Sequence, residues 1–271
     1  MRTWPSSAKP FPVVLQRNSF SPRLSARAGD VWRAMQDVVV DQSADVGWTP
    51  ARYDATNTLF VVRSMTLLHQ RELRFEDRLH GRTWPVKARR DMLFTREVRL
   101  FSGDELVATA SQEWAYLARS LEPTRAGPDI YAAFTREEGF PSAELPAHAP
   151  LAGLPAQRFT FHTWHLWMDP FGHINHPAYV DFCDEATSRA LAKAGLPALQ
   201  LSALGESVHF RAAIGANVDV TVEAQLLGEV GDDAVLLGHR ILVGDKVCAT
   251  AKTVRRLLGH GRDAWRSAFA G

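Results

Sequence analysis

The sequence predicts an α+β protein of two tandem domains with the same fold, each an antiparallel sheet wrapped around one long helix. Three observations predict it: a repeated nonapeptide, two segments with helical spacing, and a series of strand-like segments after each of them. The repeat reads GDELVATAS at residues 103–111 and GDKVCATAK at residues 244–252. The Gly-Asp step in each copy fits a hairpin turn between two strands.

Two segments carry apolar residues at helical spacing. In residues 29–47, a Gly-Asp pair precedes the apolar stripe and a glycine follows it. In residues 177–195, a proline suits the first turn and a glycine marks the end. We therefore expect one long helix in each half.

Strand-like segments follow each predicted helix. They comprise residues 59–67, 72–79 and 95–101 in the first half, and residues 207–210, 218–227, 234–243 and 246–257 in the second. A further extended segment, residues 159–168, precedes the second helix. A sheet built from such strands can bury the apolar stripe of a helix laid across it.

A proline-rich connection separates the two halves. Residues 118–157 contain six of the fifteen prolines, and a short helix is expected within them at residues 129–140. We therefore expect an N-terminal domain over residues 1–117 and a C-terminal domain over residues 158–271.

Composition narrows the class of protein. The chain has 31 Lys and Arg against 30 Asp and Glu, a formal net charge of +1, so we expect no nucleic-acid partner. Cys183 and Cys248 lie in apolar segments without metal-ligand spacing, which predicts free thiols in a reducing compartment. The N-terminus lacks the apolar region of a signal peptide, and no apolar run approaches the ~20 residues of a membrane helix. We expect a cytoplasmic protein without a membrane span.

The most informative stretch is DPFGHINHPAYVDFCDEA, residues 169–186, at a predicted strand-to-helix junction. Such a junction places polar side chains beside unpaired backbone N–H groups and the positive end of the helix dipole. This environment favours developing negative charge, as produced when a thioester carbonyl is attacked.

The same stretch resembles the D-x-x-G-H-V-N-N-x-x-Y-x-x-x-x-x-E-A signature of hot-dog thioesterases of the 4-hydroxybenzoyl-CoA thioesterase type. The matching residues are Asp169, Gly172, His173, Asn175, Tyr179, Glu185 and Ala186. Ile174 replaces the valine conservatively, and His176 stands in place of the second asparagine. The resemblance implies action on an acyl thioester.

Residues 94–117, FTREVRLFSGDELVATASQEWAYL, are similar to a segment of acyl-ACP thioesterases in which an R-[ED] strand leads through a turn to A-T-S-x-W-V. The order of elements resembles that double hot-dog family over most of residues 18–258. The resemblance implies two hot-dog domains, the first shaping the acyl pocket and the second carrying the catalytic groups. Phe171 stands where plant-type enzymes carry Asn, and residues 210–213 lack their Glu, so a CoA-type arrangement with Asp169 as the key carboxylate fits better.

Three residues are assigned to catalysis. Asp169 is expected to be a nucleophile or general base, the alternative being a turn former before proline. His173 is expected to orient the carbonyl or the attacking water, or else to fill the turn. Asn175 is expected to act chiefly as an N-cap whose side chain orders the first helical turn.

Further residues are assigned to substrate binding. Gly172, Phe171 and His176 are placed with the amides at the helix start, where they would form the oxyanion site. Gly172 also indicates a backbone conformation that other residues disfavour. Glu185 is a candidate second carboxylate, although a solvated helix face is the preferred interpretation.

The histidines and the tryptophans can each be interpreted in two ways. His162, His165, His173 and His176 match no familiar metal-ligand spacing, and His162 and His165 would point to opposite faces of a strand, so no metal or cofactor is expected. The tryptophans at positions 32, 48, 84, 114, 164 and 167 either line an acyl tunnel or pack in the core.

These observations predict a thioesterase that hydrolyses a fatty-acyl or related thioester of CoA or acyl carrier protein to the free acid. One alternative is a non-catalytic acyl-thioester-binding accessory protein. Another is a hot-dog hydratase or dehydratase, although no Gly-Asp pair here is followed by the x-Asn-Pro of those enzymes. A fused pair of domains can be monomeric or form a homodimer, and the sequence leaves this open.

Overall fold

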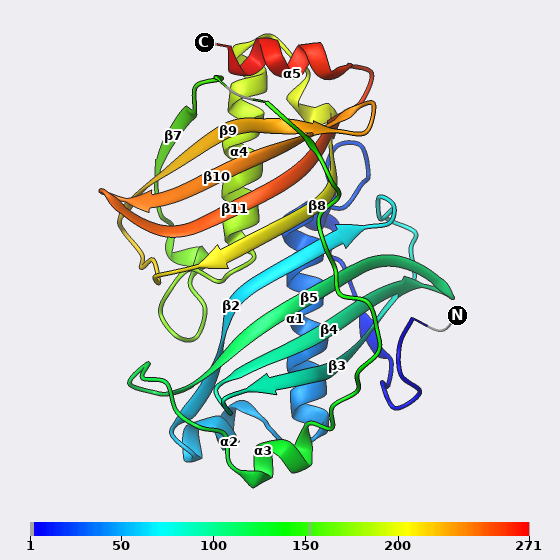
Figure 1. The fold of residues 1–271 in the computed structure, drawn as a ribbon, viewed down its shortest axis with the longest axis vertical. Coiled ribbons are helices and arrows are strands. Elements are labelled where there is room, and N and C mark those ends of the chain that lie inside the picture. Colours follow the sequence, from blue (N-terminus) through cyan, green and yellow to red (C-terminus); the bar gives the residue numbers. More distant parts are fainter. Residues whose placement is uncertain (1–2, 152, 271) are drawn as a thin grey trace.

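The computed structural model describes residues 3–151 and 153–270 (Figure 1). Eleven strands form one antiparallel sheet in the order β1-β3-β4-β5-β2-β8-β11-β10-β9-β6, with β7 also paired to β9. Each half of this sheet curves around one long helix, α1 (Ala28–Asp45) in the first half and α4 (Ala178–Lys193) in the second (Figure 1). The predicted α+β architecture is confirmed.

The first half is built mainly of strands. Its elements are β1 (Phe11–Val13), α1, α2 (Pro50–Ala55), β2 (Thr58–His69), β3 (Leu79–Arg89), β4 (Leu93–Ser102) and β5 (Glu105–Ala118). The strand expected at residues 72–79 was wrong, because this segment is a loop held by the Asp77 carboxylate. That carboxylate accepts hydrogen bonds from the Arg71 guanidinium at 2.8 Å and from the Arg74 amide at 2.6 Å.

The connection and the second half follow. Their elements are α3 (Pro128–Ala133), β6 (Ala149–Pro150), β7 (Gln157–His162), α4, β8 (Leu201–Phe210), β9 (Asp219–Val230), β10 (Ala234–Val243), β11 (Lys246–Leu257) and α5 (Arg262–Phe269). The helix expected at residues 129–140 is α3, which is shorter than predicted. Within the described chain, no helix is both long and apolar enough to cross a membrane.

The sequence repeat corresponds to a structural repeat. Its two copies lie in the hairpins β4–β5 and β10–β11, where Gly103 and Gly244 adopt left-handed φ values of +57° and +58°. Both hairpins contain an irregularity at the same place, where Val107 and Cys248 are the extra residues of a bulge. A shared bulge is a specific backbone feature, which supports a common origin of the two halves.

The two halves are joined through β2 and β8, which pair antiparallel (Figure 1). At the centre of this pairing Thr66 faces Ser207, with their hydroxyl oxygens 2.9 Å apart. Thr66 also lies opposite Ser111 and Ser207 opposite Lys252, and these two are the ninth residues of the two repeat copies. Equivalent residues therefore meet at the junction, which places a pseudo-two-fold axis there.

The two central helices meet close to the same axis. Arg33 of α1 forms an ion pair with Asp181 of α4. A Cβ atom on Gly29 would lie 1.9 Å from an Asp181 carboxylate oxygen, so only glycine permits this close approach. Apolar residues of both helices belong to one continuous core with the inner faces of both half-sheets.

Candidate active site

The predicted motif begins in a loop before α4, residues 164–177, which we name the α4 loop. Its first turn is the 3₁₀ helix His165–Trp167, so the extended segment expected at residues 159–168 ends as a strand at His162. The expectation failed because the Met168 amide donates to the carbonyl at the start of this turn, at 3.0 Å. The predicted opposite orientation of the two histidines along one strand therefore does not apply.

Backbone hydrogen bonds fix the shape of the α4 loop. The Asp169 amide donates to the His173 carbonyl at 2.8 Å, and the Gly172 amide donates to the Asp169 carbonyl at 3.0 Å. Gly172 has a φ of +77°, which is unfavourable for any residue with a Cβ atom. The D-x-x-G-H spacing of the sequence is therefore the spacing of a tight turn.

The Asp169 carboxylate is held from both sides. One oxygen accepts a hydrogen bond from the Phe171 amide at 2.8 Å, as expected of an Asp at the start of a turn. The other lies 3.2 Å from Nδ1 of His173. Its side chain is 12% exposed, so water or a substrate can still reach it.

His173 is paired with Asp169, and the hydrogen bond from the imidazole to the carboxylate raises the pKa of His173 above its ordinary value. Partial burial acts in the opposite direction and is outweighed. Since Nδ1 points to the carboxylate, Nε2 is the nitrogen available to a bound molecule.

Asn175 does not cap the helix as predicted. Helix α4 has Pro177 at its N-cap position, without any capping side-chain hydrogen bond. The backbone of Asn175 is used instead, because its amide donates to the Trp167 carbonyl and its carbonyl accepts from the Ala178 amide. Its side-chain Oδ1 is buried and has no hydrogen-bond partner among the described residues.

His176 also has a buried polar atom without a hydrogen-bond partner. Its Nε2 is buried, and nothing in the described part of the chain bonds to it. The ring packs against Trp32, Trp114 and Phe210, with centroids 5.9 to 6.4 Å apart. Burial lowers the pKa of His176 to about 3, so the imidazole is neutral at physiological pH. Two neighbouring buried polar atoms without partners are unusual away from functional sites.

The backbone amides of the α4 loop divide into used and available donors. The Gly172 amide is occupied within the turn, so Gly172 contributes its φ value rather than an oxyanion donor. Across residues 3–151 and 153–270, no acceptor is found for the amides of His173 and His176. These two N–H groups, close to the start of α4, are the available donors for an oxyanion.

Glu185 lies outside this group. Its side chain is 50% exposed and forms an ion pair with Arg189 at 2.8 Å on the surface of α4. Sequence reasoning missed the neighbouring Asp184, which points inward. Asp184 pairs at 2.7 Å with Arg255, a fully buried residue that also pairs with the buried Glu206.

An apolar cavity of about 460 Å³ adjoins the α4 loop. It is lined by α1, α2 and strands of the first half together with Pro170 and Phe171 of the loop. Much of the lining is aromatic, from Trp48, Phe60 and Trp114. The cavity is therefore shared between one half of the chain and the loop of the other.

The six tryptophans have different environments. Trp48 and Trp114 line the cavity, whereas Trp32 and Trp84 are buried but are not part of its lining. Trp164 and Trp167 stack on each other at the start of the α4 loop, with centroids 5.3 Å apart. Some of these tryptophans therefore line a cavity and others pack in the core; the role of the cavity as an acyl tunnel stays a prediction.

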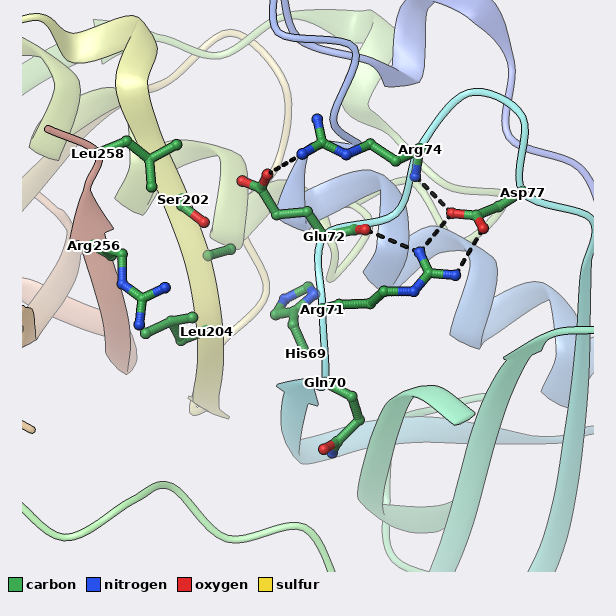
Figure 2. Close-up of a pocket in the computed structure, with 11 residues that line it drawn as sticks. His69, Gln70, Arg71, Glu72, Arg74, Asp77, Ser202, Leu204, Arg256 and Leu258 are labelled. Carbon is green, nitrogen blue, oxygen red and sulfur yellow. Dashed lines mark hydrogen bonds and ion pairs between the residues drawn. The ribbon is translucent and has the colours of Figure 1, made fainter. Parts of the chain in front are cut away.

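A second hollow, of about 590 Å³, lies between the loop after β2 and the strands β8 and β11 (Figure 2). Two of its arginines pair with carboxylates of the same hollow: Arg71 with Asp77 at 2.8 Å and Arg74 with Glu72 at 3.2 Å (Figure 2). This hollow is polar, unlike the cavity beside the α4 loop. Within residues 3–151 and 153–270, no His, Cys, Asp and Glu side chains are grouped so as to hold a metal ion.

Comparison with known proteins addresses the fold. Residues 163–264 match the family model of the thioesterase-like superfamily. A crystal structure of a putative oleoyl thioesterase from Lactobacillus plantarum superposes with a TM-score of 0.79 at 18% identity, covering 94% of this chain and 99% of that one. The chain is a double hot-dog protein. No curated protein sequence matches it.

Two further solved structures share this double hot-dog fold. An acyl-ACP thioesterase from Bacteroides thetaiotaomicron has a TM-score of 0.73 at 12% identity, covering 92% of this chain and 98% of that one. The 12:0-ACP thioesterase from Umbellularia californica has the same TM-score and identity, covering 92% and 97%. The resemblance to double hot-dog acyl thioesterases inferred from the sequence is confirmed at the level of the fold, and the motif, residues 169–186, lies inside the matched region.

Proposed function

We propose that this protein is a thioesterase that hydrolyses an acyl thioester of CoA or acyl carrier protein to the free acid. The observation that carries the proposal is the hydrogen-bonded Asp169–His173 pair, close to the start of α4 and beside an apolar cavity. In this arrangement the acyl chain occupies the cavity and the first half of the molecule shapes its pocket. The thioester carbonyl lies against the α4 loop.

The residues of the α4 loop divide the chemistry among them. Asp169 either takes a proton from the attacking water or attacks the carbonyl itself to form an acyl anhydride. The amides of His173 and His176 donate to the oxyanion of the tetrahedral intermediate. When the C–S bond breaks, the thiolate takes a proton, for which Nε2 of a protonated His173 is the nearby donor. Phe171 contacts the acyl chain at the cavity wall.

The first test is thiol release from acyl-CoA thioesters of varied length, benzoyl-CoA and acyl carrier protein thioesters, with wild type and Asp169→Asn in parallel. Turnover by the wild type that is lost in the variant supports the proposal. A single turnover in ¹⁸O water then tests the nucleophilic role of Asp169. If Asp169 forms the anhydride and water then attacks the Asp169 carbonyl, the first product molecule is unlabelled, whereas general-base catalysis always gives a labelled product. The cytoplasmic location and the homodimer remain predictions.

The second candidate function, non-catalytic binding of acyl thioesters, is favoured by one observation. Phe171, where plant-type enzymes carry Asn, is 47% exposed and supplies no polar group. Tight binding of acyl thioesters with no thiol released from any of the substrates supports this alternative.

A further inference from the structure

Three of the arginines that the structure describes are buried, and one of them lacks a counter-ion. Arg99 pairs with Glu97 at 2.8 Å, and Arg255 pairs with carboxylates of its own half. Arg96 is 8% exposed, and no carboxylate among the described residues lies within 4 Å of its guanidinium. Arg96 is therefore the buried arginine whose charge the protein leaves unpaired.

The contacts of Arg96 are neutral. One nitrogen of its guanidinium donates to Oε1 of Gln42 at 2.7 Å and lies 3.4 Å from the Thr83 hydroxyl. Its central carbon lies 5.3 Å from the centre of the Phe134 ring. Burial lowers the pKa of Arg96 to about 10, so the group is still charged at neutral pH. A buried charge is unfavourable unless a partner of opposite charge reaches it.

The sheet itself does not require an arginine at this position. Arg96 lies opposite Gln112 in the β4–β5 hairpin, and Leu237 lies opposite Thr253 at the same distance from the turn of the equivalent β10–β11 hairpin. Leu237 is fully buried. The same backbone therefore accepts leucine, so the hairpin itself does not require a charge at position 96.

Arg96 lines the same apolar cavity as Pro170 and Phe171 of the α4 loop. Its partner Gln42 is near the end of α1, whereas Trp32, near the start of α1, packs against His176 with ring centroids 6.3 Å apart. Ten residues of helix separate these two contacts, which is about 15 Å along α1. Along α1, the residue that binds the guanidinium is therefore separated from the residue that packs against the α4 loop by roughly the length of an acyl chain.

We propose that this cavity takes an acyl chain with a carboxylate at its far end, and that this carboxylate pairs with the Arg96 guanidinium. A guanidinium binds a carboxylate through two parallel hydrogen bonds, a geometry that a neutral chain end cannot satisfy. The apolar walls contact the methylene groups between the two ends. The inference rests on the proposed function and specifies its substrate class: ω-carboxyacyl thioesters.

The test compares ω-carboxyacyl-CoA with unsubstituted acyl-CoA thioesters of matched length. We expect the wild type to prefer the ω-carboxy series by about tenfold or more in kcat/KM at the best length. Arg96→Leu, which introduces the residue of the equivalent position, should abolish or reverse this preference. Arg96→Lys should retain part of it, because a cation remains. Thr95→Val, an uncharged change in the same cavity wall, should leave it unaltered.

A binding measurement tests the inference without depending on turnover. Fluorescence of Trp48 and Trp114, which line the cavity, can report binding of free dicarboxylic and monocarboxylic acids to wild type and Arg96→Lys. Preferential dicarboxylate binding without hydrolysis of any thioester would support the inference and overturn the proposed function. Equal kcat/KM for the two series in the wild type, together with equal binding of the two acids, would overturn the inference and leave the thioesterase intact.

Discussion

The loops that precede the two central helices have the same backbone and different side chains. The α1 loop, residues 16–27, contains a 3₁₀ turn followed by a bridge between Phe20 and Ala26. The α4 loop contains a 3₁₀ turn followed by a bridge between Met168 and Ile174. The α1 loop is therefore a second copy of the structure that holds the Asp169 motif.

The hydrogen bonds of the two loops correspond in detail. In the α1 loop the Ser21 amide donates to the Ser25 carbonyl at 2.8 Å, the same distance as between Asp169 and His173. Leu24 has a φ of 59° at the position that Gly172 occupies in the other copy. Even the side chains of the first pair interact, because the two serine hydroxyls are 2.9 Å apart. What differs is the chemistry: two hydroxyls replace a carboxylate and an imidazole.

The side chains around the two loops also differ. Trp114, which lines the apolar cavity, corresponds through the hairpin repeat to Arg255 in the second half. Arg255, with Asp184 and Glu206, places a buried ion-pair cluster where the other copy has open apolar space. One copy thus has a cavity beside a carboxylate and an imidazole, and the other fills the equivalent space with paired charges. The shared backbone cannot by itself account for the proposed activity, for which these side chains are needed.

The sharpest way to break the comparison is to replace the first residue of the interacting pair in each loop. Asp169→Asn should lower kcat for thioester hydrolysis by about a thousandfold or more, because the base or nucleophile is lost while the turn remains. Ser21→Ala, at the equivalent place in the α1 loop, should leave kcat within about twofold. An Asp169→Asn enzyme with more than a tenth of wild-type turnover contradicts the assignment.

The ion-pair cluster should matter for stability rather than for turnover. Arg255→Leu leaves the buried Glu206 carboxylate with only His69 and Trp32 as partners and removes the ion pair of Asp184, which should lower the free energy of unfolding by about 3–5 kcal/mol in urea titrations. Arg240→Ala removes an exposed pair with Glu223 on the adjacent strand and should cost less than about 1 kcal/mol. Equal losses in the two variants would show that the cluster has no special role.

The Asp169–His173 pair should produce a pH dependence that the serine pair lacks. The pKa of His173 is raised in the folded protein, so its contribution to stability is fully present below the ordinary histidine pKa and is lost as pH rises through the raised value. His173→Gln should remove this dependence from thermal unfolding and lower kcat about ten- to hundredfold. NMR titration of the imidazole protons should show His173 titrating above the ordinary value, and a midpoint below it contradicts the prediction.

The smallest effects on stability should come from substitutions at the positive-φ residue of each loop. Gly172→Ala should destabilise the protein by about 1 kcal/mol, because a Cβ atom is strained at this φ. Leu24→Gly should have the opposite sign and a magnitude below about 1 kcal/mol, because it relieves the same strain. Urea unfolding of both variants measures the difference, and like signs would contradict a common backbone geometry.

Much of the fold and of the site could be predicted from the sequence, and particular residues explain the limits. Asp169, Gly172 and His173 were recognisable because their spacing is that of one tight turn. The copy in the α1 loop was missed because its serines carry none of the signature, although Pro22 stands where the motif has Pro170. The turn of the α1 loop is formed by backbone hydrogen bonds, which a sequence pattern does not reveal.

Other residues were beyond sequence reasoning for a different reason. Asp184 and Glu185 are adjacent, and only the rotation of α4 decides which one is buried against Arg255 and which one is exposed. Arg96 is informative through the absence of an acidic partner in the described structure, which depends on every neighbour in space. The strand predicted at residues 72–79 had suitable alternation, but side-chain hydrogen bonds to Asp77 outweighed it.

The covalent connection between the halves has a consequence for how such a protein can change. In a symmetric dimer of identical chains, every substitution is made twice, so a residue that fills one site also fills the other. Here β2 and β8 meet as the two subunits of such a dimer would, yet each is encoded separately. Position 114 can remain Trp while position 255 is Arg, and each loop is exposed to selection independently of its counterpart.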